Sequence, residues 1–77
     1  PLGSFVKLST GEIAKVKQIN PHNALRPVVE IVMDRFGNVM IEPSELDLAQ
    51  DFQVFIFRIV PRDEVYNTVM KFAKKGK

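Results

Sequence analysis

Short apolar, β-prone runs separated by turn-forming residues occupy most of the chain before Pro61. Residues 5–8 form a short run typical of a strand, and residues 9–11 have the composition of a tight turn. From residue 13 to residue 19, lysines alternate with less polar side chains, which indicates a second strand. Because Gly11 can adopt the positive φ that such turns need, these runs predict a β-hairpin.

Residues 20–27 interrupt this alternation with two prolines. Each proline fixes its own φ, lacks an N–H donor and favours an extended conformation in the preceding residue, so we expect an ordered loop. A β-branched run then occupies residues 28–33, and a glycine-containing turn at 34–38 separates it from residues 39–41. This pattern predicts a second hairpin.

The next two segments differ sharply in hydrophobicity. Residues 43–48 place two leucines two positions apart after a proline, and we interpret them as a loop anchored by Leu46 and Leu48. Residues 54–60 are the most apolar stretch of the chain, and only Arg58 interrupts it. Such a run is typical of a central strand that is buried on most of both faces.

The period changes after Pro61. Val65, Val69 and Phe72 stand at i, i+4 and i+7, with acidic residues in the first turn and lysines in the last, which predicts an amphipathic helix over about residues 63–74. We therefore expect a mainly β (α+β) fold. It is either a small five-stranded curled sheet or a partly open SH3-like barrel, with the C-terminal helix packed against it.

The length of 77 residues allows one domain. We assign residues 5–60 to the β domain and 61–77 to the helix and a basic tail, and residues 1–4 fit both a tag remnant left by a protease and a native lead-in. A chain of this size hides only about 60% of its unfolded surface. A buried active site beside a full core is therefore hard to fit, and binding roles are favoured.

The net charge of +2 is unevenly distributed. Residues 1–61 carry six basic and seven acidic side chains, a net charge of −1, whereas residues 62–77 carry five basic and two acidic ones, a net charge of +3. The basic tail contains Lys71, Lys74, Lys75 and Lys77. These lysines can meet an anionic surface, but solvated lysines at a frayed end are the more frequent case, so nucleic acid is an unlikely partner.

The residue inventory argues against catalysis. There is no cysteine and only one histidine, His22, so the usual thiolate and imidazole sets for a metal site or a nucleophile are missing, and no glycine-rich phosphate loop occurs. We predict no enzymatic activity of the chain itself, no metal and no cofactor. No apolar run reaches the roughly 18–20 residues of a membrane helix, so we expect a cytoplasmic protein without membrane contact.

The best candidate binding residues lie in the loop at 20–27, which presents His22, Asn23 and Arg26. Arg26 can form paired hydrogen bonds with a phosphate or a carboxylate of a ligand. Alternatively, it pairs with a nearby acid of the chain while the prolines fix the connection between the hairpins. Phe36, in the turn at 34–38, is either an exposed aromatic that contacts a partner or a base, or a side chain folded onto the core.

Several short motifs occur in a recognisable order. They are Val6-Lys7-Leu8-Ser9-Thr10-Gly11-Glu12-Ile13-Ala14, Ile19-Asn20-Pro21, Leu25-Arg26-Pro27-Val28-Val29, the turn between Asp34 and Gly37, and Leu46-Asp47-Leu48. Over residues 4–48 the chain resembles the region after the catalytic domain of bacterial HD-GYP proteins, the cyclic di-GMP phosphodiesterases. The His-Asp metal ligands and the Gly-Tyr-Pro motif of that family are absent from this sequence.

The resemblance implies an accessory, non-catalytic module of a cyclic di-GMP signalling protein. Its partner would be the neighbouring catalytic domain or another protein, and its role docking, dimerisation or regulation. Because the strand at 54–60 and the helix face at 65–72 would be exposed without a neighbouring domain, we also expect the isolated chain to form a homodimer.

Two alternative functions stay open. The first is a small β-barrel nucleic-acid-binding module, using the basic tail, Phe36 and the lysines at 15 and 17. The second is a direct sensor of cyclic di-GMP, in which Arg26 meets a phosphate and Phe36 or Tyr66 stacks on guanine.

Overall fold

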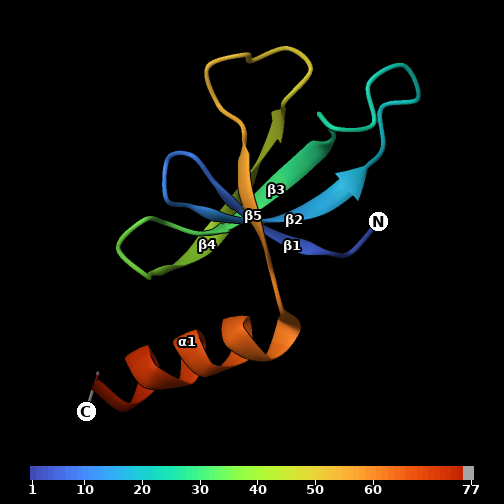
Figure 1. The fold of residues 1–77 in the computed structure, drawn as a ribbon. Coiled ribbons are helices and arrows are strands. Elements are labelled where there is room, and N and C mark those ends of the chain that lie inside the picture. Colours follow the sequence, from blue (N-terminus) through green and yellow to red (C-terminus); the bar gives the residue numbers. More distant parts are fainter. Residues whose placement is uncertain (76–77) are drawn as a thin grey trace.

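The computed structural model describes residues 1–75, with side chains up to Lys71 (Figure 1). Five strands precede one helix: β1 (Phe5–Leu8), β2 (Ile13–Gln18), β3 (Val28–Met33), β4 (Val39–Asp47), β5 (Ile56–Val60) and α1 (Arg62–Lys75). All strand pairs are antiparallel, and the order across the open sheet is β4-β3-β2-β1-β5. The predicted fold class, a five-stranded sheet with one C-terminal helix, is confirmed.

Both predicted hairpins form, β1 with β2 and β3 with β4. In the first turn Gly11 has φ +95°, and its N–H donates to the carbonyl of Leu8 at 2.9 Å. A Cβ at this position would lie 3.1 Å from the Cβ of Arg35. The turn therefore needs glycine for its backbone angle and for the close approach of a neighbouring turn.

Residues before β1 extend its ladder with β2. The N–H of Gly3 donates to the carbonyl of Val16, and the N–H of Val16 donates to the carbonyl of Ser4. The start of the described chain is thus part of the sheet.

The core lies on one face of the curled sheet, because every second side chain of a strand points to the same face. In β3, for example, Val29, Ile31 and Met33 are buried while the residues between them are half-buried. The main cluster comprises Val6, Leu8, Ala14, Val16, Val29, Ile31 and Leu48. Leu46 and Ile56 pack against it from the two edge strands.

The predicted loop at residues 43–48 is wrong, because β4 continues to Asp47. Leu46 pairs with Val29 and Glu45 with Glu30 in the antiparallel register, which shifts between Ile31 and Met33. Proline is tolerated in an edge strand or at such an irregularity, since one side of the strand needs no ladder hydrogen bond.

The predicted central strand at residues 54–60 is also wrong in its position. β5 begins at Ile56, lies at the edge of the sheet and pairs only with β1. Phe57, Arg58 and Ile59 are exposed, and only Val60 is buried. Hydrophobicity alone does not place a strand in the middle of a sheet.

The helix forms as predicted but does not pack against the sheet. Figure 1 shows α1 lying apart from the strands after the turn at Pro61, and no strand makes an extended contact with its described part. The molecule is accordingly elongated, with extents of 46 × 20 × 20 Å. Within residues 1–75 no helix is long and apolar enough to cross a membrane.

Candidate interaction site

An open groove of about 650 Å³ lies between β5 and the loop that follows β2. Its floor is formed by Val6 and Val16 of the core, and its walls include four exposed apolar side chains, Ile19, Leu25, Phe55 and Ile59. We call this feature the apolar groove. It exists because β4 and β5 are the two edges of an open sheet, so the core face is not closed between them.

Ile59 shows how the edge strand exposes the core face. It stands opposite the buried Val6 in the β1–β5 ladder, so the two side chains point to the same face of the sheet. Nevertheless, Ile59 is 61% exposed. A residue with a core-facing position therefore forms a wall of the groove.

Arg26 holds the loop that borders the groove. Its Nε donates to the carbonyl of Leu48, and its Nη2 donates to those of Asp51 at 2.8 Å and Val54 at 2.6 Å. The guanidinium carbon also lies 5.3 Å from the centre of the Phe52 ring. The hydrogen-bond partners of Arg26 are thus carbonyl oxygens. The expected alternative, in which Arg26 pairs with a nearby acidic side chain, is not observed.

Asn20 also links this loop to the chain after β3 through hydrogen bonds. Its Nδ2 donates to the carbonyl of Arg26 and to Oδ1 of Asp47 at 3.1 Å, while the same Oδ1 accepts from the N–H of Ala49. The loop after β2 is thereby joined to the end of β4. Sequence reasoning did not identify this role of Asn20, although its position before a proline marked it as part of a constrained loop.

The other candidate residues of this loop are exposed. His22 and Asn23 lie in a turn closed by the N–H of Asn23, which donates to the carbonyl of Asn20 at 3.0 Å. Asn23 and Arg26 also line the apolar groove. The structure therefore brings these two candidates to one feature.

Phe36 belongs to the turn between β3 and β4, which lies at the end of the sheet opposite the loop that follows β2 (Figure 1). It is 68% exposed, with the Arg35 guanidinium 5.0 Å from its ring centre. Oδ1 of Asp34 accepts from the N–H groups of Phe36 and Asn38, and these hydrogen bonds, first that of Asn38, lower the pKa of Asp34. The structure does not join Phe36 to Arg26 in one site.

The basic tail is described only in part. Lys71 is exposed, and Lys74 and Lys75 belong to the last turn of α1. Lys77 lies outside the described residues.

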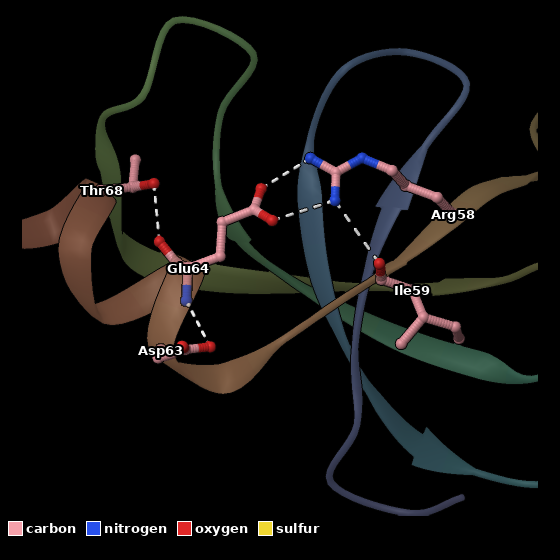
Figure 2. A network of polar contacts seen from close by, with 5 residues as sticks. All are labelled: Arg58, Ile59, Asp63, Glu64 and Thr68. Carbon is pink, nitrogen blue, oxygen red and sulfur yellow. Dashed lines mark hydrogen bonds and ion pairs between the residues drawn. The ribbon is translucent and has the colours of Figure 1, made fainter.

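An ion pair fixes the start of α1 to the sheet (Figure 2). Arg58 of β5 donates through Nη1 and Nη2 to the two carboxylate oxygens of Glu64, at 3.1 and 2.6 Å. These hydrogen bonds, together with the attraction between the charges, lower the pKa of Glu64, to which Lys7 adds a smaller effect. Arg62 lies over the ring of Phe5 at 5.9 Å. We call the Arg58–Glu64 pair the helix clamp.

The topology and the open core face define a small, mainly β domain of the KOW-like class. Residues 5–68 match the family described as the KOW domain associated with HD domain, and the chain belongs to this family. The match spans all five strands and the first turns of α1. No curated protein and no solved structure matches the chain. Association with an HD domain agrees with the resemblance found in the sequence, whereas the HD-GYP type is a narrower proposal.

Proposed function

We propose that this KOW domain is a non-catalytic, cytoplasmic protein-interaction domain that regulates the HD catalytic domain of an HD-GYP cyclic di-GMP signalling protein. The observation that carries this proposal is the apolar groove. Membership of a family associated with HD domains supports the catalytic neighbour. The motifs at residues 4–48 favour the HD-GYP type among HD proteins.

The groove has the properties of a protein-binding surface. Leu25 is 86% exposed and stands with Phe55 and Ile59 around a floor of core residues, so several apolar side chains gather in one concavity. Contiguous apolar patches on a soluble domain mark interaction sites, and clustered apolar anchors provide most of the binding energy. A surface that only faces water does not require several apolar side chains to gather in one concavity.

The groove is also held in shape before any partner arrives. Arg26 and Asn20 fix the loop that carries Leu25 to the segment after β4. A preorganised surface loses less conformational entropy on binding. This rigidity supports a docking role over a purely structural one for the loop.

The sensor alternative receives less support. Arg26 uses Nε once and Nη2 twice to donate to carbonyl oxygens, so a paired contact with a phosphate would have to replace at least one of these hydrogen bonds. The aromatic candidate Phe36 is in the turn between β3 and β4, at the other end of the sheet. Chemical-shift changes at Arg26 on addition of cyclic di-GMP would favour the sensor over our proposal.

The decisive experiment uses the parent protein with its HD domain and measures cyclic di-GMP hydrolysis. We expect the double variant Leu25→Glu/Ile59→Glu to change the rate at least severalfold, because both side chains line the groove. The matched control is Ile41→Glu, since Ile41 is 97% exposed on β4 and does not line the groove.

Unchanged hydrolysis in the folded groove variant would contradict the proposal. An equal change in the Ile41→Glu control would show that the groove is not the responsible surface. Far-UV circular dichroism and thermal unfolding of the 77-residue variants verify that both surfaces can carry glutamate without loss of the fold.

A further inference from the structure

One edge of the sheet is open beside the apolar groove. β5 pairs only with β1, and the orientation of its peptide groups follows from that ladder. In β1 the N–H of Leu8 donates to the carbonyl of Glu12, toward β2, and Val6 faces the same way because alternate residues of a strand point their backbone groups to one edge. Ile59 stands opposite Val6, so its own N–H and C=O point away from β1.

Ile59 therefore offers two kinds of contact. Its side chain is 61% exposed and forms a wall of the groove. Its carbonyl accepts from Nη1 of Arg58 at 3.5 Å, the long limit of a hydrogen bond (Figure 2). An extended segment lying along β5 can pair with this peptide group and direct every second side chain into the groove, because alternate side chains of a strand point to one face.

The charged groups that line the groove are positive. No aspartate or glutamate of the described residues lines it, whereas Arg26 and the amino-terminal residue Pro1 do. Arg26 is half-buried, and none of the described carboxylates forms an ion pair with it. Its Nε and Nη2 donate to three carbonyls, while its Nη1 donates to no acceptor within the described residues. A partly buried guanidinium without a counter-charge favours a ligand that carries a carboxylate.

Arg26 and Ile59 set the length of the segment that fits. Nη2 of Arg26 donates to the carbonyl of Val54, which stands five residues before Ile59. At about 3.3 Å per residue the two contacts are at most about 17 Å apart, which about five extended residues span. The apolar side chains of Phe55 and Ile59 line the groove between them.

We propose that the apolar groove binds an extended, apolar segment of a partner domain that contains one acidic residue. The segment adds to the open edge of β5 as a further strand, through the N–H and C=O of Ile59, and its carboxylate accepts from Nη1 of Arg26. This inference rests on the proposed function and names the chemistry of the partner. Arg26 thus receives from the partner the acidic contact that the described residues of its own chain do not provide.

Titration of the 77-residue chain with synthetic peptides tests the proposal. The probes are acetylated and amidated eight-residue peptides in which valine and serine alternate and one glutamate replaces each residue in turn, with a second series that contains glutamine instead. At least one glutamate peptide binds at least about threefold more tightly than its glutamine counterpart, because its carboxylate reaches a partly buried guanidinium. Ile59→Glu and Leu25→Glu weaken this binding, whereas Ile41→Glu, outside the groove, leaves it unchanged.

Hydrogen exchange at the Ile59 amide tests the added strand separately from the charge. In the free chain this amide exchanges faster than those of Arg58 and Val60, which face β1, and a bound peptide slows it at least about tenfold. Peptides N-methylated at alternate residues give the control, because only one of the two methylation patterns removes the donors that face β5. Binding that leaves the exchange of Ile59 unchanged, or that tolerates both patterns, would overturn the added strand.

Substitution of Arg26 tests the counter-charge. Arg26→Gln abolishes the preference for glutamate over glutamine, with the fold verified by circular dichroism, and Arg26→Lys, which retains the charge, keeps part of it. A preference that survives Arg26→Gln would belong to the amino group of Pro1 and would overturn the role of Arg26. Absence of binding by every glutamate peptide would overturn the proposal. Protection of the Ile59 amide that rises with chain concentration would also overturn it, because β5 would then pair with a second copy.

The two proposals fail separately. Absence of peptide binding combined with altered hydrolysis in the parent groove variant removes the added strand and keeps the regulatory groove. Peptide binding combined with unaltered hydrolysis keeps the binding site and removes the regulatory role.

Discussion

The sheet and helix α1 are both amphipathic, but among the described residues the sheet buries most of its apolar face while α1 buries little of its own. Leu8 of β1 and Leu48 after β4 are almost completely buried, whereas Val65 and Val69 of α1 are half-buried and Tyr66 is exposed. Antiparallel strands curl around their own side chains, while a single helix needs a second element. The comparison teaches that the sheet builds the core and that α1 adds little to it within the described residues.

The largest expected effect comes from the hydrophobic core. Leu48→Ala should lower the free energy of unfolding by about 2–5 kcal/mol, because it leaves a cavity in the core. Val65→Ala in α1 should change it by less than about 1 kcal/mol in dilute solution, since the helix face is unpacked there and alanine favours helix. Urea unfolding at low protein concentration measures both values. Similar losses in the two variants would break the contrast between sheet and helix.

The loop that borders the groove should come next. Arg26→Ala should cost about 1–3 kcal/mol, because three carbonyl oxygens lose a charged donor. Arg26→Lys should recover only part of this loss, since one ammonium group cannot replace the planar fork. Arg35→Ala, which removes an exposed arginine over Phe36, serves as the control and should stay within about 0.5 kcal/mol. Equal effects of Arg26→Ala and Arg35→Ala would refute the structural role of Arg26.

The hairpin turn should show a smaller loss. Gly11→Ala should cost about 1–2 kcal/mol, because alanine is disfavoured at φ +95°, and because its Cβ would crowd Arg35. Gly3 has φ +81° but open space around it, so Gly3→Ala separates the backbone cost from the crowding. Thermal unfolding of both variants gives the comparison, and a larger loss for Gly3→Ala would contradict the role of the close approach.

The helix clamp should have the smallest effect, and it depends on pH. Because Arg58 lowers the pKa of Glu64 in the folded chain, the pair stabilises the fold fully above the ordinary glutamate pKa, and this contribution is lost as the pH falls through the lowered value. Arg58→Gln should raise the pKa of Glu64 toward its ordinary range, as measured by NMR titration of the side-chain carboxyl. Asp34 is the internal control, because backbone N–H groups lower its pKa and the substitution should not move it. An unmoved Glu64 pKa would show that the clamp is open in solution.

Period and turn chemistry were enough to predict most of the elements. The β-branched run at residues 28–33 and the glycine turns around Gly11 and Gly37 correspond to β3 and to two tight turns with positive φ. The helix after Pro61 followed from its change of period. Each of these elements is specified by residues close together in the sequence, through their backbone preferences and the spacing of their apolar side chains.

Positions within the sheet were predicted less well. Residues 43–48 were predicted to form a loop, and residues 54–60 a central strand because they are apolar. Residues 43–47 and 56–60 instead belong to the edge strands β4 and β5, where proline is tolerated and apolar side chains can stay exposed. The candidate site shows the same limit. Arg26 was recognised as chemically capable, but its carbonyl partners lie 22 to 28 residues away in sequence.

The sequence by itself determined the mainly β class, the hairpins, the terminal helix and the absence of cysteine chemistry, because each depends on local pattern or composition. Only the tertiary structure decided which strands lie at the edges, that β5 leaves the core face open as a groove, and that Arg58 of β5 pairs with Glu64 at the start of α1. These features arise from contacts between distant segments, whose pairing is selected by the whole fold and not by any one stretch of the chain.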